Sequence, residues 1–186
     1  PGAVVTDTGD RFAPPAALPE QAVVDQRGRR FEPFVSLVAP GAAVSFPNSD
    51  DTRHHVYSFS GDNAFELKLY RSDDAPPVVF SNPGVVTLGC NIHDNMKAYV
   101  VVSEDAARAL VDADGLARLP WLPPGAPVTL RVWHPQLDEA VSYYLDAQAT
   151  ASGSVTLSLP VAWEDPQAVK SVSELESLLK RYSRDE

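Results

Sequence analysis

Residues 87–102, TLGCNIHDNMKAYVVV, hold the only cysteine and the only methionine of the 186-residue chain, with a histidine between them. Cys90, His93 and Met96 follow the spacing C-x2-H-x2-M. Apolar runs at residues 84–90 and 97–103 flank this segment, and their valine and tyrosine content is typical of β-strands. The segment therefore predicts a loop that joins two strands and presents a thiol, an imidazole and a thioether at one end of a β-framework.

The composition favours a folded, β-rich protein. Hydrophobic residues make up 44% of the chain, and its 17 prolines fall between apolar runs, as they do when strands alternate with turns. A single cysteine excludes an internal disulfide framework, and the net charge of -10 argues against binding to nucleic acid. No stretch approaches the roughly 18 to 20 apolar residues of a membrane span, and no signal peptide is visible. Either a cytosolic protein or the mature part of an exported one is therefore expected.

Short runs rich in valine, phenylalanine and tyrosine predict the first set of strands. In one of them Phe65, Leu67 and Leu69 alternate with Glu66 and Lys68, which predicts one buried face. So many short strands in about a hundred residues indicate a sandwich or a barrel. The predicted strands cover residues 21–26, 31–38, 43–46, 55–59, 64–70, 78–80, 84–90 and 97–103.

A polar, partly helical segment at residues 104–115 separates these strands from a second set at 116–122, 127–135, 139–149 and 154–161. The tail carries a capping box, Ser173 with Glu176, followed by an apolar stripe at 175, 178, 179 and 182, which predicts a helix packed back on a β-module. The second set of strands could form a small sandwich of its own or extend the first; we favour a separate module, which gives an N-terminal arm (1–20), a first β-domain (21–103), a small β-module (104–162) and a tail with the C-terminal helix (163–186).

The donor types at the loop indicate a metal. A thiolate, an imidazole and a thioether are the ligands of a trigonal copper site with a long axial methionine, and that site needs a second histidine. Zinc fits less well because structural zinc sites favour several cysteines, and one thiolate cannot hold an iron–sulfur cluster. The segment FPNSDDTRHHVYSF (46–59) supplies His54 and His55. Because neighbouring side chains in a strand point to opposite faces, only one of the two is expected to face the metal.

Two segments carry a resemblance to a known family. The pattern N-x5-H-x-V from Asn48 to Val56 and the pattern C-x2-H-x2-M from Cys90 to Met96 resemble the ligand segments of cupredoxins, the blue copper proteins such as plastocyanin and amicyanin. The short second spacing is similar to that of amicyanin. The longer string from 46 to 102 resembles bacterial proteins described as methylamine utilisation proteins, and residues 112–135 resemble a carboxypeptidase-regulatory-like β-sandwich. The implied fold is all-β: a cupredoxin-like Greek-key sandwich, a small second β-sandwich and a C-terminal helix.

The resemblance also implies a ligand set for one copper ion. His54, Cys90 and His93 would be the equatorial ligands, and Met96 the weak axial one. His55 stands where plastocyanin-like chains have asparagine, so it is expected to face solvent or to support the ligands, and a site that recruits both histidines stays open.

Three further side chains near the ligands carry expectations. Some red copper proteins use a glutamate ligand, but we expect Glu66 to be an exposed partner of Lys68 or Arg71. Asn91 and Asp94 are expected to form hydrogen bonds within the ligand loop.

The function implied is that of a one-electron carrier with a type 1 copper site, not an enzyme. Electrons would pass through the exposed edge of His93 to a redox partner such as a c-type cytochrome or a dehydrogenase in the periplasm. The acidic chain would steer a basic partner electrostatically. Two alternatives stay open: a periplasmic copper chaperone or sensor that binds Cu(I) without redox cycling, and a ligand-binding β-sandwich protein.

Overall fold

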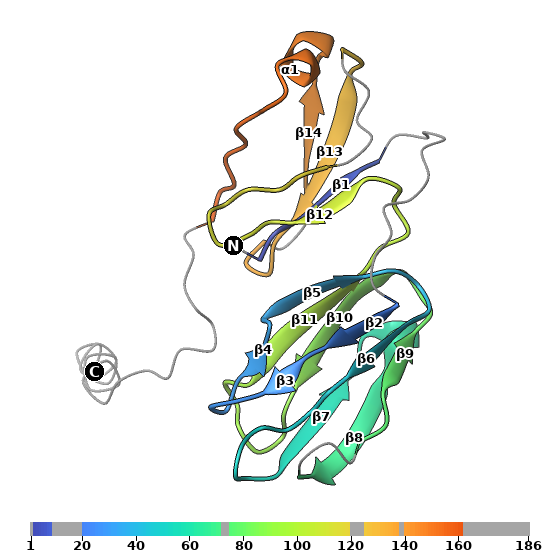
Figure 1. The fold of residues 1–186 in the computed structure, drawn as a ribbon, viewed down its shortest axis with the longest axis vertical. Coiled ribbons are helices and arrows are strands. Elements are labelled where there is room, and N and C mark those ends of the chain that lie inside the picture. The colour runs from blue at the N-terminus through green and yellow to red at the C-terminus, as the bar shows by residue number, and fades with distance from the viewer. Residues whose placement is uncertain (1, 9–19, 72–74, 120–124, 138–139, 162–186) are drawn as a thin grey trace, which may run out of the picture.

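The computed structural model describes residues 2–8, 20–71, 75–119, 125–137 and 140–161. Strands dominate this part of the chain and form four sheets, which confirms the all-β prediction (Figure 1). None of the helices described is long and apolar enough to cross a membrane. The elements are β1 (Val4–Asp7), β2 (Gln21–Val23), β3 (Asp25–Gln26), β4 (Phe31–Glu32), β5 (Val35–Val38), β6 (Ala42–Ser45), β7 (His54–Ser58), a 3-10 turn (Gly61–Asn63), β8 (Phe65–Tyr70), β9 (Val78–Phe80), β10 (Gly84–Gly89), β11 (Lys97–Val102), β12 (Arg108–Leu110), β13 (Val128–Trp133), β14 (Val141–Leu145) and α1 (Ala147–Ala151).

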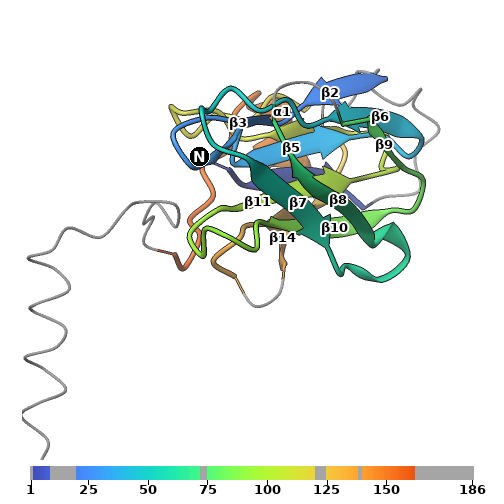
Figure 2. The same ribbon diagram turned by 90° about the horizontal axis from the view of Figure 1, so that it is seen from below.

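The first half of the chain forms a two-layered sandwich. A five-stranded sheet, in the order β5-β11-β10-β7-β8, packs against a three-stranded sheet, β2-β6-β9, and the two layers are seen apart in Figure 2. Each predicted strand of this region is present, although residues 21–26 and 31–38 are each divided into two strands. The core between the layers is built from inward-facing residues of both sheets: Val44, Phe80, Val86, Leu88, Ala98 and Val100 are each at most 1% exposed.

Strand β11 is buried on both faces. Its alternate residues Ala98, Val100 and Val102 face the sandwich core, while Tyr99 and Val101 face a second cluster that includes residues of the next sheet. A strand covered on both sides is expected to be apolar throughout, as the run AYVVV is. The four-stranded sheet of β12, β1, β13 and β14, called the second sheet below, therefore covers part of the outer face of the sandwich.

The second sheet has the order β12-β1-β13-β14, so β1, the first strand described, is one of its two inner strands (Figure 1). The N-terminal arm expected over residues 1–20 thus contains a strand, which pairs antiparallel with both β12 and β13. The two faces of β1 explain why: Val5 packs into the core of the second sheet, and Val4 packs into the cluster with Tyr99. The described chain passes from the second sheet into the sandwich and then returns to the second sheet.

Other differences from the sequence prediction lie in the second module. Residues 108–110, expected within a partly helical segment, form β12 because the edge of β1 offers them backbone partners. Strand β14 ends at Leu145, where the Asp146 carboxylate accepts hydrogen bonds from two backbone N–H groups and starts α1. Residues 154–161 and 116–119 form no strand; Leu157 and Leu159 pack on the second core without backbone pairing. The predicted C-terminal helix lies outside the described residues.

An aromatic contact joins the second sheet to the sandwich. Tyr99 of β11 meets Trp133 of β13 edge to face, with ring centroids 5.4 Å apart, and Phe34 packs on the same tyrosine at 5.5 Å. Val4 and Val35 complete the buried cluster. Pairs of this kind stabilise an interface beyond the area they bury.

The position of β1 makes a testable prediction about stability. Val5→Ala removes methyl groups from the core of the second sheet, so the free energy of unfolding should fall by about 2 kcal/mol, as measured by chemical denaturation. Val79→Ala, at a β9 position that is 57% exposed, is the matched control and should change stability by less than about 0.5 kcal/mol. Equal effects of the two substitutions would contradict the central place of β1.

Candidate metal centre

Strand pairing brings the two predicted ligand segments together. β10 lies between β7 and β11, with Gly89 opposite Tyr57 on one side and opposite Lys97 on the other. Cys90 directly follows β10, and His54 is the first residue of β7, so both lie at the same end of the sheet. The loop 90–96 returns the chain to β11 and is closed by a hydrogen bond from the Met96 N–H to the His93 carbonyl (3.0 Å).

Three potential ligand atoms converge at this end. The Cys90 Sγ lies 4.0 Å from Nδ1 of His54 and 4.0 Å from Nδ1 of His93, and these donor atoms all lie within 4.8 Å of one another. A metal about 2.0 Å from nitrogen and about 2.3 Å from sulfur, with its bonds about 120° apart, sets the two atoms roughly 3.7 Å apart. The observed sulfur–nitrogen distances of 4.0 Å fit a bound metal whose sulfur–metal–nitrogen angles are somewhat wider than this.

The alternation of β7 explains which of the neighbouring histidines faces Cys90. His54 and Val56 point inward, and the His54 ring is fully buried. His55 points to the other face, where its Nε2 lies 2.9 Å from a carboxylate oxygen of Glu66. The structure therefore brings His54, and not His55, to the thiol.

Two expectations about the outer face need correction. Glu66 is exposed as expected, but its partner is His55 rather than Lys68 or Arg71. His55 is only 6% exposed, so the solvent-facing one of its two expected positions is wrong; its ring packs beside that of Tyr57, with the centroids 5.4 Å apart. The backbone register pairs Tyr57 with Glu66, which places that carboxylate on the same face as His55.

A β-bulge on β8 also alters the predicted burial pattern. The register steps from His54 opposite Tyr70 to Val56 opposite Leu67, so β8 has one extra residue at this point. Leu69 is consequently 52% exposed instead of buried, and Tyr70 turns inward, where it packs on the core and its hydroxyl donates to the Phe46 carbonyl. Burial raises the pKa of Tyr70 to about 12, so the hydroxyl remains a donor beside the site.

The loop before β7 supports His54 through Asp50, which the sequence analysis did not single out, and through Asn48, the first residue of the N-x5-H-x-V pattern. The Asp50 carboxylate lies 2.8 Å from Nε2 of His54. Asn48 holds the loop in shape: its amide donates to the Thr52 and Tyr70 carbonyls, and its carbonyl oxygen accepts from the Asp50 N–H at 3.0 Å. The sequence PNSDD predicts a turn. It does not predict that the Asp50 carboxylate contacts the ring of His54, four residues further along the chain.

The electrostatics of the site favour neutral imidazole next to a fixed negative charge. Burial lowers the pKa of His93, and the nearby His54 and Arg29 lower it further, so its ring nitrogen keeps a free lone pair at neutral pH. Burial alone would raise the pKa of Asp50, but hydrogen bonds from the Arg29 N–H, from His54 and from the Gly28 N–H outweigh it and hold this pKa below its usual value.

The other predicted loop residues differ in their surroundings. Met96 is 1% exposed and belongs to the sandwich core, and it lines the same groove as Cys90. Asn91 and Asp94 are exposed, and neither side chain makes a hydrogen bond to another residue of the described segments. Their expected role within the loop therefore stays a prediction.

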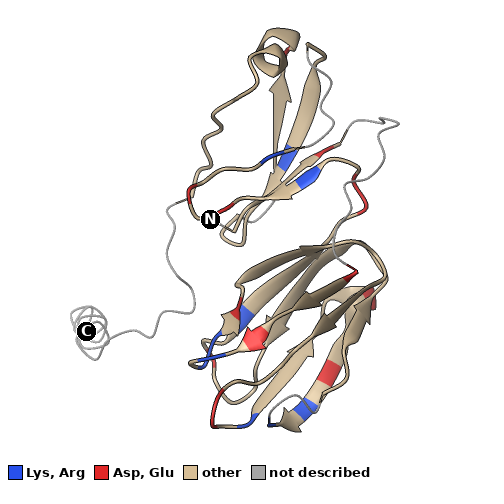
Figure 3. Cartoon of the chain, in the orientation of Figure 1, with Lys and Arg blue, Asp and Glu red and all other residues tan. Residues whose placement is uncertain are grey.

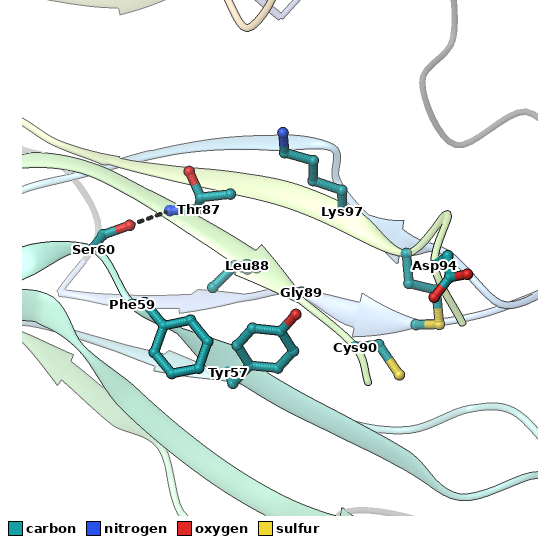
Figure 4. Close-up of a pocket in the computed structure, with 10 residues that line it drawn as sticks. Tyr57, Phe59, Ser60, Thr87, Leu88, Gly89, Cys90, Asp94 and Lys97 are labelled. Atoms are coloured by element: carbon teal, nitrogen blue, oxygen red, sulfur yellow. Dashed lines mark hydrogen bonds between the residues drawn. The ribbon is translucent and has the colours of Figure 1, made fainter. Parts of the chain in front are cut away.

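A groove of about 350 Å³ runs along β10 next to the thiol. The Tyr57 ring lies against Gly89, and only glycine leaves room for it there: a Cβ would lie 2.8 Å from the ring. Figure 4 shows the Tyr57 ring beside Gly89, Phe59 next to it, and Cys90 just beyond the end of β10. The Tyr57 and Phe59 centroids are 5.0 Å apart, and Phe59 is 85% exposed.

The charges around the site are mixed, although the chain as a whole has a net charge of -10. The turn between β3 and β4 carries the sequence RGRR (27–30), which gathers basic residues at the site end of the sandwich (Figure 3). Exposed Arg53 and Asp51 lie together in the loop before β7. The local surface is therefore not uniformly acidic.

The donor set fits a single copper ion. Two imidazole nitrogens and one thiol converge from two strand ends, with a thioether in the same loop, and this combination of soft and borderline donors selects copper over zinc. The Cys90 thiol and the His54 ring are both buried. An ion held here is therefore shielded from water on that side.

Comparisons with solved structures return copper proteins for about half of the chain. A copper-containing nitrite reductase from Thermus scotoductus SA-01 aligns over 48% of this chain and 24% of its own, with 26% identity and a TM-score of 0.43. Amicyanin from Paracoccus versutus aligns over 53% of this chain and 97% of its own (22% identity, TM-score 0.41). A purple cupredoxin from Nitrosopumilus maritimus aligns over 44% and 99% (20% identity, TM-score 0.40). No protein-family model and no curated protein matches the chain.

The close approach of Tyr57 to Gly89 can be tested by a double-mutant cycle. Gly89→Ala places a methyl group against the Tyr57 ring and should lower the free energy of unfolding by about 1–3 kcal/mol. In a Tyr57→Ala background the same change should cost much less, because the obstructing ring is gone. An equal cost in both backgrounds would show that the ring does not lie over the glycine.

Proposed function

We propose that the protein is a one-electron carrier with a type 1 copper site, in which His54, Cys90 and His93 are the equatorial ligands and Met96 is the weak axial ligand. The observation that carries the proposal is the convergence of a thiol and two imidazole nitrogens within 4.8 Å of one another at one end of the sandwich. Bound copper supplies a one-electron Cu(II)/Cu(I) couple whose potential is tuned by the thiolate and the axial thioether.

The residues around the site are suited to holding the ligands in one geometry. His54 is anchored in β7 and Cys90 directly follows β10, and both strands lie inside the sheet with a neighbour on each side. Core residues on both strands, Val56 and Leu88, are fully buried. Because the ligands cannot move far, little reorganisation opposes electron transfer. Four protein ligands leave no position for a substrate, so we propose a carrier and not an enzyme.

The exchange of electrons with a partner is proposed to occur at the loop 90–96. His93 is partly exposed there, in contrast to buried His54, and the neighbouring Ile92 is 46% exposed. A partner such as a c-type cytochrome or a dehydrogenase in the periplasm would dock over this edge. Because local charges at the site end are mixed, electrostatic steering of a basic partner would come from the net charge of the whole chain.

The visible spectrum of the copper-loaded protein tests this function. An intense band from thiolate-to-Cu(II) charge transfer, bleached reversibly by reduction, is expected for the wild type. Cys90→Ala and His54→Ala should abolish it because each removes an equatorial ligand. The neighbouring substitution His55→Gln is the matched control and should retain the band.

Three results would contradict the proposal. The first is the absence of an intense band from wild-type protein loaded with copper, and the second is a band that survives Cys90→Ala. The third is copper that leaves rapidly for a competing chelator without redox cycling, which would indicate the copper chaperone instead.

A further inference from the structure

The carboxylate of Asp50 has three hydrogen-bond donors. Its Oδ1 accepts from the Gly28 N–H at 2.6 Å, and its Oδ2 accepts from the Arg29 N–H at 2.9 Å and lies 2.8 Å from Nε2 of His54. The two backbone donors belong to the turn between β3 and β4, which is about twenty residues away along the chain. A single side chain therefore connects this turn to a candidate copper ligand.

The backbone of the turn is shaped to receive an anion. Gly28 and Arg29 both have positive φ, +61° and +59°, and Arg29 is the only non-glycine residue of the described segments with this conformation. Successive backbone N–H groups in a turn can form a concave anion site, and here the N–H groups of Gly28 and Arg29 both donate to the Asp50 carboxylate. A left-handed conformation costs free energy for a residue with a Cβ. Here it is stabilised by the hydrogen bond from the Arg29 N–H to the carboxylate.

The same carboxylate determines where the proton of His54 lies. A carboxylate only accepts hydrogen bonds, so a neutral His54 must carry its proton on Nε2 to donate to Asp50. The other nitrogen, Nδ1, then has a free lone pair, and this is the atom that faces the Cys90 sulfur at 4.0 Å. Because the His54 ring is fully buried, bulk water does not compete with Asp50 for the Nε2 proton.

We propose that Asp50 is a positioning residue: held by the N–H groups of Gly28 and Arg29, it fixes the tautomer and orientation of His54 so that Nδ1 is presented to copper. Its second effect is electrostatic, because a carboxylate hydrogen-bonded to a ligand imidazole makes that ligand a stronger donor and favours Cu(II). This inference rests on the proposed copper function for its second effect only. The tautomer of His54 is a property of the metal-free protein.

The chain offers a matched pair of variants. Asp50→Asn keeps the size of the side chain but replaces one of the two acceptor oxygens by an NH2 group. That NH2 group must face either the Gly28 N–H or the His54 ring. If the amide donates to Nε2, the ring proton moves to Nδ1, the ligand atom. Asp51→Asn removes the same charge one residue away, at an exposed position. Any difference between the two variants therefore reports the contact and not the net charge.

The first measurement is the tautomer of His54 in the metal-free protein, from the nitrogen chemical shifts of its ring by NMR. The wild type and Asp51→Asn should both show the Nε2–H form, and Asp50→Asn should show a mixture or the Nδ1–H form. A wild-type Nδ1–H form would overturn the proposal without any variant.

The second measurement is copper binding and the reduction potential. Loss of a hydrogen-bond partner of a metal ligand typically weakens metal affinity by about 10- to 100-fold. We expect Asp50→Asn to show a loss of this size and a raised potential, and Asp51→Asn to stay within about twofold of wild type. Equal affinities for the two variants would overturn the electrostatic effect. Failure of the wild type to bind copper would overturn the proposed function but leave the tautomer result standing.

Discussion

The pairing of β7 with β10 is the constraint on which the candidate copper centre depends. His54 and Cys90 are 36 residues apart in sequence, and no local interaction brings them together. The sheet does so, because Gly89 lies opposite Tyr57 and both ligand residues then lie at the same strand ends. A shift of this register by one residue would turn His54 to the outer face and His55 to the thiol. The inward packing of Val56 and Leu88 in the sandwich core opposes such a shift.

The second sheet packs on the sandwich away from the ligand residues. Its sheet takes β1 as an inner strand and covers the outer face of β11 through Tyr99 and Trp133. The uncovered remainder of that face holds Tyr57, Phe59 and the groove beside Cys90. Strands β1, β12, β13 and β14 thus cover a part of the sandwich that holds none of the candidate ligands.

The sequence predicted most strands of the sandwich and the residues that meet at its end. Outside the sandwich, the strand predicted at residues 127–135 forms β13 of the second sheet, with Val128, Leu130 and Val132 buried. The loop spacing and the histidine pair were enough to predict a thiol–imidazole cluster, because ligand chemistry depends on residue type. Strand alternation predicted that only one of His54 and His55 faces the metal, and the N-x5-H-x-V spacing from Asn48 to Val56 favoured His54.

What the sequence did not predict depends on contacts between distant segments. Strand β1 is stabilised by β12 and β13, more than a hundred residues away, so the four residues VVTD give no hint of a central strand. The bulge that exposes Leu69 is set by the pairing of β8 with β7. The hydrogen bond between Asp50 and His54 depends on a turn at residues 28–29 whose backbone shape has no sequence signal beyond one glycine.

The central claim is that one metal ion is held by a thiol and two imidazoles from β7 and the loop after β10. X-ray absorption at the copper edge of the copper-loaded protein tests this most directly, because it counts the sulfur and nitrogen atoms bound to the metal. The structure predicts one short bond to sulfur and two to imidazole nitrogen. A copper environment of oxygen and nitrogen alone, with no short bond to sulfur, would contradict it.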